Sequence, residues 1–278
     1  MSSVQPSAQS SPPVGPSGAF MPIDRASSGA ALRVRRIGPA DLWAALKAGA
    51  EDFREHPSQL FFLMLIYPLV GLFLGRLALG YEVLPLLYPL AAGFALLGPI
   101  TAVGLYEVSR RREMGMPHGL VYALDVRRAP TFGAILMIAL VLTVTFVIWL
   151  VAAMGLYWWI FGSYVPRSIS AFASDLFTTG RGLKLIVAGN ALGFLFALFA
   201  MSFSVVSLPL LVDRPVDLAC AIRTSFRAVG ENFGTLLLWG FIVALALALG
   251  SLPFFIGLAV VLPVLGHATW HLYRRLVV

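Results

Sequence analysis

Two histidines near the C-terminus are the side chains whose spacing most suggests chemistry. His267 and His271 lie four residues apart, so on a helix they share one face and could hold a metal ion or face a haem. A closed metal site needs further ligands, and no second dense group of His, Cys or carboxylate residues supplies them. The alternative is that both histidines anchor the end of a membrane helix beside Trp270 and Tyr273. His267 and His271 are the candidate cofactor-binding residues, although the sequence predicts neither a bound cofactor nor a metal site.

Two glycine pairs are candidates for close contact between helices. Gly71 and Gly75 form one GxxxG pair, and Gly189 and Gly193 form another, with Asn190 beside it. Small residues at this spacing let helix backbones approach each other in a membrane. The pairs suggest close helix packing, self-association or contact with a membrane-protein partner. Asn190 is interpreted as a hydrogen-bonding contact between helices, with a substrate contact as the alternative.

Motifs of enzyme chemistry are absent from the sequence. It contains no Walker loop, no GxSxG motif, no HExxH motif and no dinucleotide fingerprint. Glu107 precedes Arg110, Arg111 and Arg112 in a charge block that follows an apolar stretch. The block is typical of a stop-transfer signal. A further hypothesis pairs Glu107 with an arginine at a neighbouring helix end, in a partly hydrated contact worth about 1 kcal/mol or less. No catalytic residue is predicted, and we expect the protein not to be an enzyme.

The composition places these residues in a membrane protein. Of the 278 residues, 59% are hydrophobic and only 12% are charged, with a mean hydropathy of +0.87. Soluble domains carry about 25% charged residues, so a soluble single-domain enzyme is excluded. A spanning helix needs about 20 mainly apolar residues. The sequence predicts an all-α, polytopic membrane helix bundle with six transmembrane helices, at about residues 60–79, 84–106, 132–161, 185–212, 235–250 and 254–273.

The basic residues indicate how the chain is threaded. With six spans and the N-terminus inside, 16 of the 20 lysines and arginines face the cytoplasm and 4 face the other side. Cytoplasmic segments of membrane proteins carry such an excess of Lys and Arg. We therefore predict a multi-pass membrane protein with both termini in the cytoplasm. This threading accounts for the net charge of +7, so nucleic acid is not an expected partner.

Three segments between the spans carry apolar residues at helical spacing. They lie at residues 41–55, 169–177 and 217–231, and the stripe of the last consists of Leu218, Ile222, Phe226 and Val229. Amphipathic helices of this kind lie at the membrane interface or pack across the ends of a bundle.

An internal repeat organises the membrane part. Residues 41–56 align with residues 217–232, Pro99 aligns with Pro263, and residues 118–128 form a weaker third copy. The sequence predicts a threefold parallel repeat, in which each unit has one interfacial amphipathic helix and two spans.

The first 36 residues differ from the rest of the chain. They are rich in Ser, Pro, Gly and Ala and contain no long apolar run. Such a stretch cannot bury enough surface to offset the entropy that it would lose on ordering. We predict a disordered cytoplasmic tail at residues 1–36 and an integral membrane domain at residues 37–278.

Four motifs carry a resemblance to one protein family. They are EVSRRRE at residues 107–113, PLLVDR at 209–214, AVGEN at 228–232 and PVLGHATWHLYR at 263–274. Together they resemble a bacterial family of predicted integral membrane proteins, domain of unknown function 2189. The resemblance extends from about Ile37 to the C-terminus. It implies a bacterial inner-membrane protein and assigns no activity.

Three functions are open on the sequence. The leading hypothesis is a non-enzymatic scaffold, or support for a membrane assembly, in contact with the lipid bilayer and a membrane-protein partner. The first alternative is a transporter or channel for a small solute, although no charged residue lies near the middle of a predicted span. The second alternative is a haem- or metal-binding membrane redox protein that uses His267 and His271.

Overall fold

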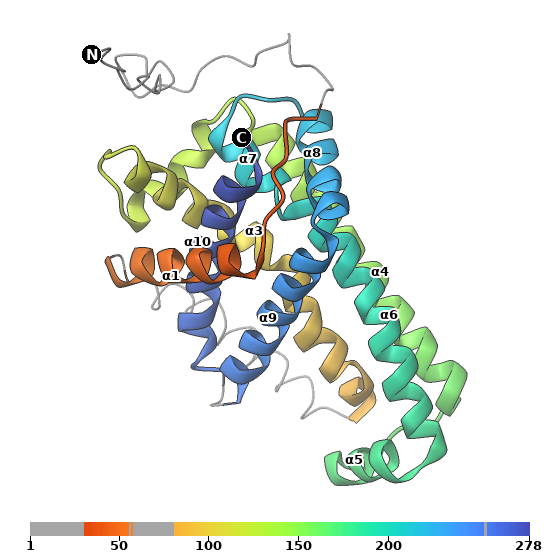
Figure 1. The fold of residues 1–278 in the computed structure, drawn as a ribbon. Coiled ribbons are helices and arrows are strands. Elements are labelled where there is room, and N and C mark those ends of the chain that lie inside the picture. Colours follow the sequence, from red (N-terminus) through yellow and green to blue (C-terminus); the bar gives the residue numbers. More distant parts are fainter. Residues whose placement is uncertain (1–30, 56, 58–80, 253–254) are drawn as a thin grey trace, which may run out of the picture.

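The described chain is helical (Figure 1). A computed structural model describes residues 31–55, 57, 81–252 and 255–278. In chain order the helices are α1 (Pro39–Glu55), η2 (Tyr81–Leu86), α3 (Leu87–Glu113), η3 (Leu120–Arg128), α4 (Phe132–Phe161), α5 (Ile169–Thr178), α6 (Gly180–Ser204), α7 (Ser207–Asp213), α8 (Leu218–Glu231), α9 (Phe233–Ser251) and α10 (Leu258–Leu276). Within these ranges, extended pairing is limited to one antiparallel bridge between Val34 and Val277. The all-α class is confirmed for this part of the chain.

Three stretches of the described chain are long and apolar enough to cross a membrane. They are Phe132–Phe161, Gly180–Asp213 and Phe233–Ser251, which correspond to α4, to α6 with α7, and to α9. They coincide with the spans predicted at residues 132–161, 185–212 and 235–250.

The other three predicted spans are not confirmed. Residues 60–79 lie outside the described residues, and the spans at residues 84–106 and 254–273 correspond to α3 and α10, which are not among the candidates. The second half of α10 is polar, because it holds both histidines and two arginines.

The long helices connect two ends of the molecule. In Figure 1, α4 and α6 lie side by side and lead down to α5, whereas α7, α8 and the C-terminus lie at the opposite end. One face of α4 packs inward through Ile138 and Leu142, while Leu140 and Val151 are more than half exposed. Apolar exposure along a whole helix is the expectation for contact with lipid or with another membrane helix.

Three shorter helices cross longer ones. α1 packs against α10, η3 against α3, and α8 against α6 and α7. The buried face of α1 consists of Leu42, Ala45, Gly49 and Asp52. A Cβ atom on Gly49 would lie 2.5 Å from the backbone nitrogen of Ala268. Only glycine therefore lets the backbones of α1 and α10 approach this closely.

The buried face of α8 differs from the predicted stripe. Its buried side chains are mostly small: Cys220, Ala221, Thr224, Ser225, Ala228 and Val229. Of the apolar stripe predicted for this segment, Val229 is buried, whereas Phe226 is 44% exposed. Small side chains allow α8 to lie close to α6 and α7, and this advantage outweighs the burial of one aromatic ring.

Residues just before α1 belong to the folded part. The amide of Leu32 donates to Thr224 Oγ1 at 3.0 Å, and the amide of Arg35 donates to the carbonyl of Leu276 at 2.8 Å. The amide of Ile37 donates to Asn232 Oδ1 at 2.8 Å. Residues 32–35, which lie within the predicted tail of residues 1–36, thus bind through backbone groups to α8 and its C-cap and to the C-terminus.

Candidate functional site

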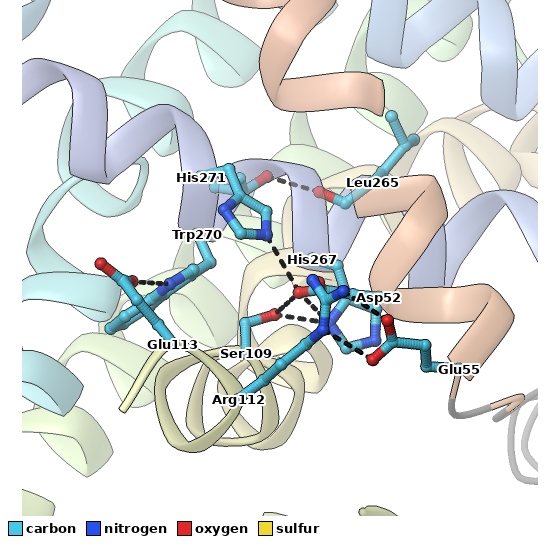
Figure 2. Close-up of polar contacts among 10 residues, drawn as sticks. Asp52, Glu55, Ser109, Arg112, Glu113, Leu265, His267, Trp270 and His271 are labelled. Carbon is cyan, nitrogen blue, oxygen red and sulfur yellow. Dashed lines mark hydrogen bonds and ion pairs between the residues drawn. The ribbon is translucent and has the colours of Figure 1, made fainter. Parts of the chain in front are cut away.

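The candidate site lies where α1, α3 and α10 meet, with Asp52 of α1 at its centre (Figure 2). The start of α1 is fixed by Asp41, whose carboxylate accepts a hydrogen bond from the amide of Gly38 at 3.0 Å. Asp52 is the last residue on the buried face of this helix and is 1% exposed. The close approach of Gly49 to Ala268, one turn earlier, brings the Asp52 carboxylate between α3 and α10.

One carboxylate oxygen of Asp52 binds side chains from two other helices. The hydroxyl of Ser109 in α3 donates to Asp52 Oδ2, and His271 Nε2 in α10 lies 3.0 Å from the same oxygen. His267 Nδ1 lies 2.7 Å from Ser109 Oγ. A serine hydroxyl has one proton, which here goes to Asp52, so His267 is the donor in its contact with Ser109. A continuous hydrogen-bonded chain therefore runs from His267 through Ser109 and Asp52 to His271.

The second carboxylate oxygen of Asp52 binds an arginine. Arg112 Nη1 of α3 lies 2.5 Å from Asp52 Oδ1. The same guanidinium makes a two-pronged contact with Glu55, with Nε 2.7 Å from Oε2. Paired hydrogen bonds between arginine and carboxylate fix orientation as well as adding energy. Arg112 thus joins the last turns of α1 and α3 at the outer edge of the cluster.

These contacts determine the protonation state of Asp52. Burial by itself would raise the pKa of the carboxyl group. Hydrogen bonds from His271 and Ser109, together with the charges of His271 and His267, outweigh burial, so the pKa of Asp52 is lowered from its ordinary value of 3.8. Asp52 is therefore an ionised acceptor at neutral pH.

Serine, histidine and aspartate also form the catalytic triad of hydrolases, but the arrangement here is different. In a triad the histidine lies between the other two and takes the proton of the serine. In this cluster Ser109 donates directly to Asp52, and His267 Nδ1 lies 3.7 Å from Asp52 Oδ2. Ser109 and His267 are each 1% exposed, so a substrate has no access to Ser109 Oγ in this conformation. The geometry is that of a hydrogen-bonded network that joins three helices.

The structure brings the two predicted cofactor ligands, His267 and His271, to the same carboxylate. Within the described ranges, no group of three or more His, Cys, Asp or Glu residues is arranged to hold a metal ion. A haem iron needs a ring nitrogen that points into open space. His271 Nε2 is bound to Asp52, and the His267 side chain is buried. Cofactor binding through these residues stays a prediction that the geometry does not favour.

A second set of contacts ties together the ends of α3, α7 and α10. Arg274 of α10 lies 2.9 Å from Glu113 of α3 and 3.2 Å from Asp213 of α7. The hydroxyl of Tyr273 donates to Asp213 at 2.6 Å, and Trp270 Nε1 donates to Glu113 at 3.1 Å. Trp270 and Tyr273, beside which the two histidines were alternatively interpreted as membrane anchors, are both buried between helices of the same chain.

Glu107 has a role other than the hypothesised one. Its side chain is fully buried and pairs within its own helix, with Arg110 and with Arg111, each at 2.8 Å. Arg111 extends the contact to Asp125 of η3 at 2.8 Å. The hypothesis that Glu107 pairs directly with a neighbouring helix end is therefore wrong, because Arg111 makes that connection. Because Glu107 is buried, its contact is also not partly hydrated, as the hypothesis assumed.

Of the two predicted glycine pairs, one lies outside the described residues and the other lies in α6. Gly71 and Gly75 lie outside the described residues. In α6, a Cβ atom on Gly193 would lie 3.2 Å from the ring of Trp149 in α4, and one on Gly189 would lie 3.9 Å from Leu156. This pair therefore serves packing within the chain. Asn190 also makes a contact between helices, since its Oδ1 accepts from the hydroxyl of Tyr88 at 2.8 Å.

Asp52, Ser109 and Arg112 were not among the predicted site residues. A signal for Asp52 was present, because Leu42, Ala45, Gly49 and Asp52 recur at intervals of three and four residues on one helix face. A carboxylate at the end of an apolar face needs a buried partner. Nothing in the sequence identified α3 and α10 as the source of that partner.

Comparison with known proteins supports membrane insertion. Residues 87–213, from α3 to α7, match the family described as a predicted integral membrane protein, domain of unknown function 2189. The resemblance indicated by the motifs is confirmed over this range, which includes Ser109 and Arg112 but neither Asp52 nor the two histidines. No curated protein and no solved structure matches the chain.

Proposed function

We propose that this integral membrane protein has a non-enzymatic role, as a scaffold or support for a membrane assembly. The proposal rests on the polar cluster shown in Figure 2, in which buried side chains form hydrogen bonds with one another. Asp52, Ser109 and His267 are each 1% exposed and bind one another across three helices. A buried network whose members are bound to each other rigidifies a structure and specifies one arrangement. Such a network suits a protein that holds other components in place.

The helix packing supports the threefold repeat. α1, η3 and α8 begin the three units, and each packs on the last helix of another unit, namely α10, α3 and α6 with α7. Small residues lie at all three crossings. Gly49 meets Ala268, Gly104 meets Ala123, and Ser225 Oγ accepts the amide of Val206 at 3.2 Å. The three units interlock in a closed cycle, so separation of any one unit would uncover a buried face on another.

We propose six spans with both termini in the cytoplasm, which the described charges support, and the cell inner membrane, which the family resemblance implies. Arginines gather in the last turns of α3, η3 and α10 and in the middle of α8, and these helix segments lie away from α5 in Figure 1. The end of the molecule near α5 carries Arg167, Arg181 and Lys184. The positive-inside rule assigns the first end to the cytoplasm.

The exposed face of α9 is the surface that we assign to a membrane-protein partner. Leu237, Phe241, Leu245 and Leu249 recur every four residues along this helix, and each is more than one third exposed. Only 17% of the most apolar part of α9 is buried against the rest of the described chain. A straight apolar row of this length can pack along a partner helix.

Photo-crosslinking in the native membrane tests the proposal. A photoreactive phenylalanine derivative would replace Leu245, which is 48% exposed, or, as a matched control on the same helix, Leu236, which is fully buried. We expect position 245 to give a protein adduct of defined additional mass, and position 236 to link only within the chain. If positions 241, 245 and 249 all give lipid adducts alone, the scaffold role is incorrect.

A further inference from the structure

The end of the molecule that carries α5 contains a cavity away from the polar cluster. It measures about 590 Å³ and lies between the last turn of α4, the following loop, and the start of α6. Its lining includes Phe161, Tyr164, Arg181 and Lys184. This volume lies within the range of small-ligand sites, about 300–1,000 Å³.

Two cations face this cavity from one side of α6. Arg181 and Lys184 are three residues apart, so they share a helix face. Both side chains are exposed, and no ion pair joins either of them to another residue in the part of the chain that the structure describes. The one carboxylate of the lining, Asp175, already accepts a hydrogen bond from the hydroxyl of Tyr164 at 2.7 Å. A third cation, Arg167, is close enough to act electrostatically on Tyr164.

The location of these cations is unexpected on topological grounds. Under the proposed threading, only 4 of the 20 basic residues lie on the outer side, and Arg181 and Lys184 are two of those four. These few outer cations play no part in the cytoplasmic excess that sets the threading, and two of the four line this one cavity.

The flanking residues place the cavity at the level of lipid headgroups. Trp158 and Trp159, in the last turn of α4, are 62% and 82% exposed, and Phe177 of α5 is 80% exposed. Exposed tryptophans next to an apolar helix are typical of the membrane–water interface. A ligand in this cavity would therefore have an anionic group beside Arg181 and Lys184 and apolar chains along α4 and α6.

We propose that this cavity binds the headgroup of an anionic phospholipid, with Arg181 and Lys184 holding its phosphate. Arginine offers paired donors that match phosphate oxygens, and lysine adds a compact charge. The assignment does not depend on the first amide groups of α6, since the amide of Gly182 already donates to Thr179 Oγ1 at 3.0 Å. It rests on the proposed threading, but not on the scaffold role.

Native mass spectrometry of the full chain from nanodiscs tests the proposal. The nanodiscs would contain equal amounts of phosphatidylglycerol and phosphatidylethanolamine. We expect the wild-type protein to retain phosphatidylglycerol preferentially, and the double variant Arg181→Gln, Lys184→Gln to retain about tenfold less. The matched control, Arg127→Gln with Arg128→Gln, removes two exposed cations at the opposite end and should retain as much as the wild type.

Each other outcome overturns the assignment. Equal retention of both lipids by the wild-type protein would show that no anionic headgroup is selected. Equal loss in both double variants would reflect overall charge rather than a site. Displacement of the lipid by millimolar inorganic phosphate would indicate a soluble anion as the ligand. Size-exclusion profiles would establish that the variants are folded, and the crosslinking at Leu245 reports on the scaffold role separately.

Discussion

At the scale of single residues, the chemistry of this protein is concentrated on one carboxylate. Asp52 receives hydrogen bonds from Ser109 and His271 on one oxygen and from Arg112 on the other. The donors come from α3 and α10. On folding, they exchange hydrogen bonds with water for hydrogen bonds with the Asp52 carboxylate. Removing the carboxylate would leave buried donors without an acceptor, which costs more than the net value of the bonds.

Asp52→Asn should therefore destabilise the protein. An amide of nearly the same shape keeps the packing but loses the charge that faces Arg112 and His271. We expect the free energy of unfolding to fall by about 3 kcal/mol, the magnitude found when one member of a buried pair is removed. Thermal unfolding in mild detergent would measure the loss. Asp175→Asn, at a carboxylate outside the cluster, is the control and should change stability far less.

The acid dependence of stability follows from the lowered pKa of Asp52. Because the pKa of Asp52 is lower in the folded state than its ordinary value of 3.8 in the unfolded state, Asp52 contributes stability at pH values above 3.8. That contribution is lost as the pH falls through the lower, folded value. The difference in stability between the wild type and Asp52→Asn should shrink progressively as the pH falls below about 5. A difference that grows with acidification would contradict this assignment.

At the scale of elements, the crossings of short helices over long ones depend on small residues. Gly49 lies against the backbone of Ala268, and Gly104 lies against Ala123. Side chains at such points act as spacers, and their size sets the distance between helix axes. The same crossing of α1 over α10 carries Asp52 into the cluster, so packing and polar contacts depend on each other.

Gly49→Ala should separate α1 from α10. The new methyl group would lie 2.8 Å from the Cβ of Ala268 and 2.5 Å and 2.7 Å from its backbone nitrogen and Cα, which cannot move aside as a flexible side chain could. We expect a loss of about 1–2 kcal/mol, as for overpacked interiors. Gly230→Ala in α8 is the matched control, because nothing lies within 4 Å of its Cβ position. Thermal unfolding should show no loss for the control, and equal shifts for both variants would argue against a close crossing.

At the scale of the whole molecule, the two ends differ in charge and in construction. The end with α7, α8 and the C-terminus is joined by ion pairs such as Arg274 with Glu113 and Arg275 with Asp41. The end with α5 contains the cavity and the exposed tryptophans. This asymmetry is the basis of the proposed orientation in the membrane.

Cysteine labelling tests that orientation. Cys220 is the single cysteine of the chain and is fully buried, and burial raises the pKa of its thiol, so it should not react. In right-side-out vesicles, an impermeant maleimide should label Ser163→Cys, in the loop before α5, and should spare Arg128→Cys, at the end of η3. Inside-out vesicles should give the reverse. Labelling of both positions from one side would reject the proposed threading.

Much of the helical framework could be predicted because its signals are local. The span predicted at residues 132–161 coincides with α4, since an apolar run of that length forms a helix in a membrane, where its backbone groups must bond within the segment. The amphipathic segments at residues 41–55 and 217–231 correspond to α1 and α8 for a similar reason. Hydropathy alone did not identify the residues that α8 buries inside the chain, because it ranks Phe226 above alanine and serine, whereas close packing favours the small residues.

The sequence by itself determined the helical class, three apolar stretches long enough to span a membrane and the uneven distribution of basic residues, because these depend on composition along short segments. Only the tertiary structure decided which polar side chains meet. Asp52 lies 57 residues from Ser109 and 219 residues from His271, and no local pattern encodes such pairings. They arise because Gly49 allows α1 to cross α10 at close range. The two histidines, which as a pair suggested a cofactor site, thereby become partners of a carboxylate that holds three helices together.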